Sequence, residues 1–487
     1  MNEEIRDLEP KEIWSKFADL NAVPRPSKHE EKVIQFMLDF GRGLGLEVSK
    51  DLVGNVIIKK PATKGMENRK TVILQSHLDM VHQKNADTVF DFSTQGIEMF
   101  VDGDWVRAKG TTLGADNGLG VATIMALLES TGIPHPPLEA LFTIDEETGM
   151  TGAKGLQGGL LQGEILLNLD TEEDDEIDIG CAGGVDITAR GAYSQVAHDT
   201  GYTTYQIAVK GLSGGHSGMD IHKGLGNANK IMNKLLLLGQ EQLNLGVIEI
   251  EGGGLRNAIP RESVALVALK STESDKFMEL FQTWSKDLKA DHSATEPKLS
   301  IEVIPLSVPV SLMEADAQNA LLWSIKKAHN GVYAMSKAME DLVETSNNIA
   351  RVEVKNGSIK IACLTRSSVE AGKNELANKL KENFEEADYE VTLSGDYPGW
   401  QPNPDSEVLK LLNAKYVELF KEQPNVVACH AGLECGILGQ NYPEVDMISF
   451  GPTIKGAHSP DERASISSLQ KFWKFILRVL EETPTKG

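Results

Sequence analysis

The chain contains 487 residues and is strongly acidic, with 71 aspartates and glutamates, 48 lysines and arginines, and a formal net charge of -23 at pH 7. A chain of this length exceeds a single ordinary core, so we expect at least two domains. The negative charge repels polyphosphates and anionic membrane surfaces, which excludes nucleic acid and membranes from the expected partners.

The beginning of the chain lacks the basic and apolar segments of a secretory signal, and no apolar run reaches membrane-spanning length. We therefore expect a cytoplasmic protein. The cysteines are too few and too scattered to form a disulfide framework, and they make no C-x-x-C pair. We expect reduced, mostly buried thiols at Cys181, Cys363, Cys429 and Cys435.

The first part of the chain alternates helical and strand-like segments. Apolar residues recur at steps of three and four between residues 11 and 45, a spacing that predicts helices. Short apolar runs predict strands at Val53–Lys59, Thr71–Gln75, Leu138–Thr143 and Ile165–Leu169, with a helix at Gly118–Ser130. This alternation predicts an α/β fold with a largely parallel sheet, whose ligands bind beyond the carboxyl ends of the strands.

The middle of the chain has a different pattern, which occurs twice. After the acidic segment 172–178 and the turn 181–184, strands alternate with long amphipathic helices as far as about residue 395. The order strand, helix, strand repeats with weak residue identity. We expect the first copy at Val264–Lys270, Asp275–Leu288 and Leu299–Ile304, and the second at Ile359–Leu364, Val369–Glu385 and Tyr389–Leu393.

A Pro/Gly-rich segment, residues 396–402, marks a return to the first domain. An expected helix at Ser406–Phe420 and a strand at Met447–Phe450 follow it. We therefore predict a discontinuous domain, residues 1–186 and 397–487, and an inserted α+β domain, residues 187–396, built from two similar halves.

Histidines and carboxylates follow several of the expected strands. His77 and Asp79 are two residues apart, so they share one face if the strand continues, and Asp79 can hold the imidazole of a metal-binding His77. By itself, such a pair more often marks a structural histidine. Asp116 lies in a Gly-Ala-Asp-Asn-Gly segment that is typical of a turn, although a carboxylate there could bridge two cations.

Further acids and a histidine complete the pattern. Adjacent acids such as Glu146 and Glu147 usually form a solvated loop, but in a metal site one coordinates while the other moves a proton. Asp170 ends a strand, and we expect the acidic run 171–176 after it to be surface without catalytic meaning. Together with His458, these residues predict a dinuclear metal site, because unrelated surface acids would not recur at strand ends.

The motifs around these residues resemble the signatures of the aminoacyl-histidine dipeptidase family, also called Xaa-His dipeptidase or peptidase D. This family belongs to a clan of dinuclear zinc metallopeptidases that includes carnosinases. The resemblance runs essentially end to end. It is carried by residues 76–81, 114–118, 145–150, 168–170, 180–184, 256–262, 430–436 and 457–462.

This resemblance implies a role for each candidate residue. The zinc ligands would be His77, Asp116 and Asp170 for one ion, and Asp116, Glu147 and His458 for the other. Asp116 would bridge the two ions, Glu146 would be the general base and acid, and Asp79 would orient His77. The family also implies a cis peptide bond after Asp116.

The inserted domain would be the lid that this family closes over its substrate. His216 lies in a Gly-Gly-His-Ser-Gly segment, which by itself is typical of a flexible turn. The resemblance instead implies that His216 donates a hydrogen bond to the carbonyl oxygen of the substrate as this oxygen becomes an oxyanion. Asn257 would help to bind the same peptide. Arg366 ends a strand and is either a surface arginine or a bidentate clamp on the terminal carboxylate of the substrate.

Shorter relatives in the clan take a lid histidine from a partner subunit. This chain has two lid-like copies, with His216 in one and Arg366 in the other, so one chain could assemble the whole site. We expect either a monomer or a homodimer. His430 and Glu434 are candidates for positions behind the ligands, and a structural glycine-rich loop is an equal alternative.

These observations predict a hydrolase of small peptides, chiefly dipeptides with a free amino terminus, including those that end in histidine. The expected cofactors are two divalent cations, Zn2+ first and Mn2+ or Co2+ as alternatives, because carboxylate-rich sites accept several metals. The rival functions are an N-acyl amino acid deacylase with the same centre and a non-catalytic peptide-binding relative. A two-metal phosphoesterase would need more local positive charge.

Overall fold

The computed structural model describes residues 2–198 and 200–486, and the chain folds into two compact units. The discontinuous unit comprises Met1–Gly180, Pro402–Ala428 and Leu433–Gly487. The inserted unit comprises Cys181–Gln401 and Cys429–Gly432. Each unit has its own sheet. The function predicted for the inserted unit, that of a lid, stays a prediction.

The discontinuous unit is built on an eight-stranded mixed sheet in the order β1-β2-β6-β3-β7-β23-β8-β22. Its central strands β6, β3, β7 and β23 are parallel, and every residue of β3, β6 and β7 is buried, as is usual for a parallel sheet covered on both faces. This sheet confirms the predicted α/β fold. The bounds are β1 Glu47–Lys50, β2 Val56–Lys60, β3 Val72–His77, β6 Leu138–Thr143, β7 Ile165–Asn168, β8 Glu176–Cys181, β22 Asn425–Cys429 and β23 Asp446–Ser449.

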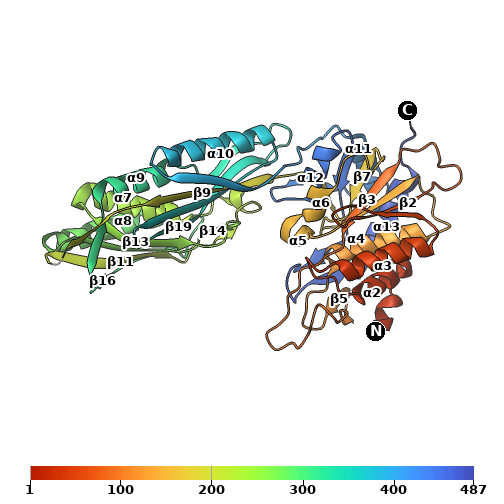
Figure 1. Cartoon of the computed structure of the whole chain (residues 1–487), viewed down its shortest axis with the longest axis horizontal. Helices are drawn as coiled ribbons and strands as arrows, with labels where there is room; N and C mark the ends of the chain where they lie inside the picture. The colour runs from red at the N-terminus through yellow and green to blue at the C-terminus, as the bar shows by residue number, and fades with distance from the viewer. Residues whose placement is uncertain (1, 199, 487) are drawn as a thin grey trace. The chain divides into compact units, whose positions relative to one another are not determined.

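Helices cover this sheet, with α4 packed on β3 and α2, and α11 packed on β23 and α13 (Figure 1). A smaller sheet pairs β4 Met99–Asp102, β5 Trp105–Ala108, β24 Ile454–Lys455 and β25 Arg463–Ser465. The helices are α1 Glu3–Arg6, α2 Lys11–Asn21, α3 Glu31–Gly43, α4 Ala115–Glu129, α5 Glu146–Gly149, α6 Thr151–Gly155, α11 Glu407–Phe420, α12 Glu434–Asn441 and α13 Ile466–Glu481.

The inserted unit is built on a nine-stranded antiparallel sheet in the order β16-β11-β15-β13-β19-β20-β9-β21, with β18 paired to β19. The strands of this sheet are β9 Gly183–Ala192, β11 Tyr202–Lys210, β13 Gly246–Gly253, β15 Ser263–Lys270, β16 Ser300–Leu306, β18 Gly331–Met335, β19 Val343–Lys355, β20 Ser358–Ser367 and β21 Glu390–Tyr397. Short pairs join β10 Gln195–His198 to β17 Val310–Met313, and β12 Gly215–His216 to β14 Ala258–Ile259. The helices are α7 Ala228–Leu243, α8 Ser274–Asp291, α9 Ala315–Lys327 and α10 Glu370–Glu385.

Two halves of the same topology make up this sheet, which confirms the predicted duplication. The first half runs β11, α7, β13, β15, α8, β16, and the second runs β9, α9, β19, β20, α10, β21. Across the sheet, the strands of the first half lie in the order β13, β15, β11, β16, and those of the second half in the order β19, β20, β9, β21. In both halves the second strand along the chain is therefore followed by the third, the first and the fourth. The sequence pattern placed the copies one after the other, but the first half lies inside the second, because β9 precedes it in the chain and pairs with β20.

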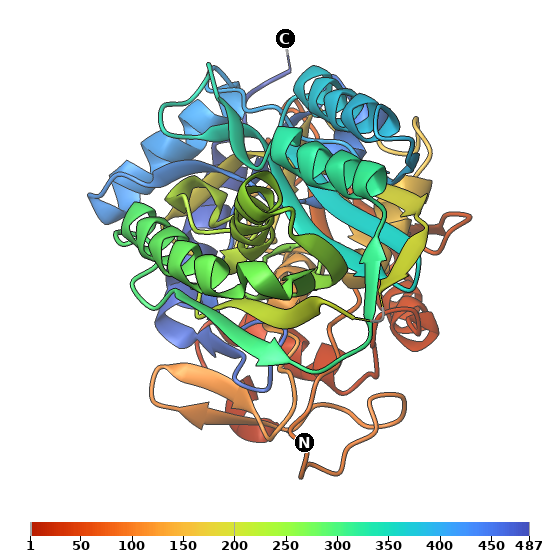
Figure 2. The ribbon, with the colours of Figure 1, turned by 90° about the vertical axis from the view of Figure 1, so that its left-hand side faces the viewer.

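The four helices lie side by side on one face of the sheet (Figure 1, Figure 2). Alternate strand residues such as Ile187, Val267 and Ile361 point into the main apolar core beneath them. Their neighbours along each strand therefore point to the opposite face, which carries the polar residues described below.

Two expectations about the whole chain can be compared with the structure. All four cysteines lie in the described residues, no disulfide joins them, and three of them are buried, as predicted. In the described residues, 2–198 and 200–486, no helix combines the length and the apolar character needed to cross a bilayer.

Candidate metal centre

His77 ends β3, and its side chain is almost completely buried, with 1% exposed. Nε2 lies 3.2 Å from Asp116 Oδ1 and 3.5 Å from Asp170 Oδ1. Nδ1 lies 3.4 Å from Asp79 Oδ1 and 3.2 Å from the main-chain oxygen of Asp79. Asp79 therefore holds one ring nitrogen, while the other points at two carboxylates.

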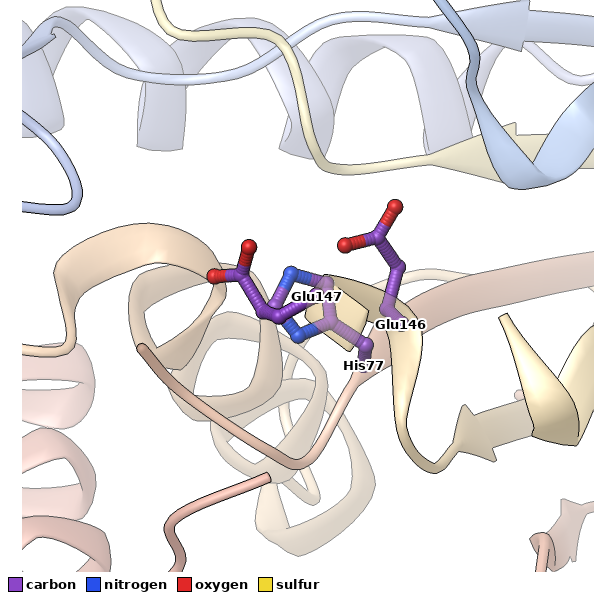
Figure 3. Close-up of side chains that lie close together, drawn as sticks. All are labelled: His77, Glu146 and Glu147. Carbon is purple, nitrogen blue, oxygen red and sulfur yellow. The ribbon is translucent and has the colours of Figure 1, made fainter. Parts of the chain in front are cut away.

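Asp79 also places the glutamate pair. Its carboxylate accepts the N–H of Glu146 at 3.0 Å and the N–H of Glu147 at 3.3 Å, and it accepts the Ser27 hydroxyl at 2.8 Å. The pair opens α5 directly after Asp145, whose φ of 51° makes a sharp turn at the end of β6. The two glutamate side chains and the His77 imidazole consequently lie close together (Figure 3), with possible ligand atoms within 4.8 Å.

Asp116 lies between the two predicted histidine ligands, with Oδ1 at His77 and Oδ2 at 3.1 Å from His458 Nε2. The peptide bond to Asn117 is cis, as the resemblance implied. The Asn117 amide donates to Leu169 O at 2.9 Å and to Asp170 Oδ1. Asp170 therefore receives one hydrogen bond from the residue next to Asp116.

Two residues without a predicted role hold the segment that precedes Asp116. The Glu462 carboxylate accepts the main-chain N–H groups of residues 113 to 116 at 2.7 to 3.2 Å. Arg25 is 1% exposed and donates to the main-chain oxygens of Leu78, Asp79 and Gly114. Arg25 therefore ties the end of β3 to the start of α4. Glu462 is the last residue of the His-Ser-Pro-Asp-Glu motif that carried the resemblance, so the sequence could have indicated a role for it. No local sequence pattern marks Arg25.

The electrostatics of the centre fit divalent cations. Two sets, His77 with Asp116 and Asp170, and Asp116 with Glu147 and His458, each offer ligand atoms within 4.8 Å of one another. Hydrogen bonds with Asp116 and Glu147 raise the pKa of His458 to about 11, so the two carboxylates favour a positive charge at this position. Glu147 Oε1 is buried and has no hydrogen-bond partner. Imidazole and carboxylate donors with one oxygen still unpaired are the ligands expected of Zn2+ or a similar metal.

The acidic run after Asp170 was predicted to be a surface segment, and this prediction is wrong for the start of the run. Thr171 is buried with 7% exposed, Glu172 is half-buried, and only Asp175 in the run is classed as exposed. Burial, followed by the charges of Asp116 and Asp170, raises the pKa of Glu172 to about 8. The physical reason is that both residues are bonded to neighbouring segments: Thr171 to the Asp178 side chain, and the Glu172 main-chain oxygen to the N–H of Ile454.

Behind the centre, buried polar side chains connect the strands by hydrogen bonds. Glu434 is completely buried, and its Oε2 accepts from Gln75 Nε2 and Thr143 Oγ1, each at 2.7 Å. Asn168 donates to Gln75 Oε1 at 2.5 Å. Because Gln75 and Asn168 lie two residues before His77 and Asp170, these bonds hold the strand ends that carry both residues.

The same chain of hydrogen bonds continues to β8. Ser449 donates its hydroxyl hydrogen to Asn168 Oδ1, and Thr171 Oγ1 lies 2.8 Å from both Ser449 Oγ and Asp178 Oδ2. Burial raises the pKa of Asp178 to about 7. The polar network therefore ends in one carboxyl group at Glu434 and another at Asp178.

The predicted substrate residues lie in the inserted unit. His216 belongs to β12, and its Nδ1 accepts the N–H of Gly218 at 3.3 Å and of Met219 at 3.0 Å. Burial and the charge of Arg366 lower the pKa of His216. Because Nδ1 is an acceptor, the neutral ring carries its hydrogen on Nε2, which is free to act as a donor.

Asn257 is exposed, and its main-chain oxygen accepts the N–H of Ser217, so it lies beside the His216 loop. Asn348 donates to the main-chain oxygens of Arg256 and Ala258, on either side of Asn257. The loop of Asn257 is therefore held from both halves of the inserted unit. Arg366 lies in β20 with 5% exposed, which excludes the surface-arginine alternative.

His430 is buried beside these residues, and its Nε2 lies 2.8 Å from Ser346 Oγ. Burial and the charges of Arg366 and His216 lower the pKa of His430 to about 3, so its ring is neutral. The His430 and Glu434 side chains thus belong to different units, although they are four positions apart in one motif.

Comparison with known proteins agrees with this geometry. Residues 73–482 match the model of "Peptidase family M20/M25/M40". The cytosol non-specific dipeptidase of Escherichia coli (strain K12) is 43% identical over 483 residues, which cover 99% of this chain and 100% of that protein. The crystal structure of aminoacylhistidine dipeptidase from Vibrio alginolyticus has a TM-score of 0.95 at 43% identity and covers 99% of both chains.

A more distant structure shares the fold alone. Aminopeptidase PepT from Bacillus cereus is 16% identical, with a TM-score of 0.57 over 98% of this chain and 99% of its own. The family match spans most of the chain, and the 43% identity extends over nearly all of it. The chain therefore belongs to peptidase family M20/M25/M40, whose members are metal-dependent peptidases.

Proposed function

We propose that this protein is a metal-dependent dipeptidase that hydrolyses dipeptides with a free amino terminus, including those that end in histidine. The observation that carries the proposal is the pair of residue sets that share Asp116. Glu146 belongs to neither of these two sets, although its carboxylate also lies within 4.8 Å of ligand atoms of His77 and Glu147. The relatives named as a cytosol non-specific dipeptidase and an aminoacylhistidine dipeptidase support the substrate class.

Two divalent cations, Zn2+ first and Mn2+ or Co2+ as alternatives, fit the two sets. His77, Asp116 and Asp170 would hold one cation, and Asp116, Glu147 and His458 would hold the other. When bound, such cations supply Lewis acidity towards a peptide carbonyl and lower the pKa of a water molecule. Asp79 would keep His77 in the orientation and tautomer that a ligand needs.

Glu146 would move the proton. Its main-chain N–H is fixed by Asp79, and burial raises the pKa of its carboxyl well above the usual value. A carboxylate that binds protons more tightly than usual is suited to take one from the attacking water and give it to the leaving amine.

The inserted unit would act as the lid and bind the rest of the peptide. The Nε2–H of neutral His216 would donate to the carbonyl oxygen as negative charge develops on it. Asn257 would contribute a further polar contact, and Arg366 would bind the terminal carboxylate. We also propose a cytoplasmic location, by similarity to the relative named as a cytosolic enzyme. The oligomeric state, monomer or homodimer, stays a prediction.

Metal content and turnover of two variants test the division of roles. Glu146→Ala should retain bound metal and lose nearly all hydrolysis of Ala-His, because it removes the proton carrier and leaves both ligand sets intact. His458→Ala should lose metal as well as activity, because it removes a ligand. Equal metal loss in the two variants would contradict this division.

A substrate panel separates the rival function. Metal-stripped protein is reconstituted with Zn2+, Mn2+ or Co2+ and assayed with dipeptides, a tripeptide and N-acetylated amino acids. A dipeptidase should cleave the dipeptides fastest. Preferential cleavage of the N-acetylated amino acids would instead indicate a deacylase.

A further inference from the structure

A row of residues crosses the inserted sheet on the face opposite its helices. Arg366 of β20 pairs with Gly184 of β9, and Gly184 pairs in turn with Tyr397 of β21. Val185 and Cys363 point into the core under the helices, so the alternation of strand side chains places Arg366 on the other face. Across this row, Arg366 Nη1 donates to the Tyr397 hydroxyl at 2.8 Å.

The glycine between them makes this contact possible. A Cβ atom on Gly184 would lie 2.7 Å from Tyr397 Oη and 2.8 Å from two atoms of its ring, which is too close for any side chain. The Tyr397 ring therefore crosses β9 over Gly184 to reach Arg366. The main-chain oxygen of Tyr397 is held by Nζ of the fully buried Lys373 at 2.7 Å. Tyr397 is thus fixed at its backbone as well as at its hydroxyl.

Arg366 keeps unused hydrogen-bonding capacity in this arrangement. Its Nε is buried and has no hydrogen-bond partner. Within residues 2–198 and 200–486, no carboxylate forms an ion pair with Arg366. The nearby His430 is neutral, since burial and the charge of Arg366 lower its pKa to about 3. Burial raises the pKa of Asp186 and the charges of Arg256 and Arg366 oppose this rise, but Asp186 forms its ion pair with Arg256. A buried guanidinium without an ion-pair partner of its own is unfavourable, and a carboxylate from a ligand would compensate its charge.

We propose that Tyr397 is a positioning residue that directs Arg366 and thereby sets a preference for substrates with a free terminal carboxylate. This inference rests on the proposed dipeptidase function, in which Arg366 binds that carboxylate. The Tyr397 hydroxyl accepts one of the two Nη1 hydrogens and fixes the plane of the guanidinium, so that Nε and Nη2 can face a bidentate carboxylate. The hydroxyl does not touch the substrate and acts only through Arg366.

The structure offers a matched control for the tyrosine hydroxyl. Tyr389 precedes β21, and its ring lies over Gly191 of β9, as the ring of Tyr397 lies over Gly184. The Tyr389 hydroxyl is buried and makes no hydrogen bond to Arg366. Tyr389 lies on the helix-covered face of the sheet and Tyr397 on the opposite face. Tyr397→Phe and Tyr389→Phe therefore remove the same atom from two tyrosines that each cross β9 over a glycine, but only the first change frees Arg366.

Steady-state kinetics with Ala-His and its C-terminal amide provide the first test. Tyr397→Phe should raise KM for Ala-His by about tenfold, the effect of losing one hydrogen bond to a charged group, and should leave kcat little changed. The amide should be cleaved as by the wild type, because it has no carboxylate. Tyr389→Phe should keep the wild-type ratio of the two substrates. An unchanged carboxylate-to-amide ratio in Tyr397→Phe would overturn the inference.

A double-variant comparison shows whether Tyr397 acts through Arg366. Arg366→Gln should lose the preference for the carboxylate, and adding Tyr397→Phe to it should cause no further loss. Independent losses that multiply in the double variant would mean that Tyr397 has only a general structural role. Melting temperatures of all variants establish that they are folded.

Equilibrium binding separates this inference from the proposed function. The probes are an Ala-His analogue with CH2–NH in place of the scissile amide, and the C-terminal amide of that analogue. Tighter binding of the carboxylate form by the wild type, reduced about tenfold by Tyr397→Phe, would support the inference even if Ala-His were not hydrolysed. Equal binding of both analogues by the wild type would overturn it, even if dipeptides were hydrolysed.

Discussion

Replacing Asp178 by asparagine tests the buried hydrogen-bonded chain behind the metal centre. Thr171 and Ser449 have one hydroxyl hydrogen each, and Ser449 donates its hydrogen to Asn168. If Asp178 were ionised, Thr171 would donate to it, and the 2.8 Å contact between the Thr171 and Ser449 oxygens would contain no hydrogen. A protonated Asp178 can donate to Thr171, which then donates to Ser449. The geometry therefore favours the neutral carboxyl group.

The pH dependence follows from the pKa of this carboxyl group. Burial raises the pKa of Asp178 from 3.8 to about 7, so the folded protein binds more protons than the unfolded chain between these values. The stabilisation is fully present below pH 3.8 and is lost as the pH rises through about 7. About three pKa units at 1.36 kcal/mol each correspond to about 4 kcal/mol in total, of which about 2 kcal/mol is lost between about pH 5.5 and 8.5.

Urea unfolding of chelator-treated protein measures this loss without the charge of bound cations. Asparagine has the same size, can donate to Thr171 and does not titrate. The free energy of unfolding of Asp178→Asn, relative to the wild type, should therefore rise by about 2 kcal/mol from about pH 5.5 to 8.5. Thr171→Val, which keeps the carboxyl group, should be less stable and retain the pH dependence. A difference between Asp178→Asn and the wild type that stays constant, or falls with pH, would refute a neutral Asp178.

Two further substitutions test the supports of the two proposed sites. Glu462→Ala leaves the buried N–H groups of residues 113 to 116 without their acceptor. The free energy of unfolding, measured by denaturation, should fall by about 3 kcal/mol. The metal affinity, measured by metal titration, should fall about tenfold or more. A Cβ on Gly218 would lie 2.0 Å from His430 O, so Gly218→Ala should displace the His216 loop and lower kcat/KM about tenfold with metal content unchanged. Gly254→Ala has open space around its Cβ and is the control. Unchanged kcat/KM in Gly218→Ala would show that the loop does not contribute to turnover.

Much of the fold was visible in local patterns. The expected strand at Leu138–Thr143 has the observed bounds, and the expected helix at Val369–Glu385 differs from α10 by one residue at its start. Apolar runs and helical spacing report on burial within one element, which is why they identify its type and position. The nesting of the two halves was missed, because a strand such as β9 shows its own burial but not which strand it will pair with.

The sequence by itself predicted which residues would carry the chemistry, since histidines and carboxylates at strand ends can be recognised by their position. Its motifs also carried the resemblance to a family of metallopeptidases. Only the tertiary structure decided what supports them: Glu462 around the segment before Asp116, Arg25 between the end of β3 and the start of α4, and Tyr397 across a glycine from Arg366. These contacts join segments that are distant along the chain, and their energy depends on distances and burial that exist only after the sheets have formed.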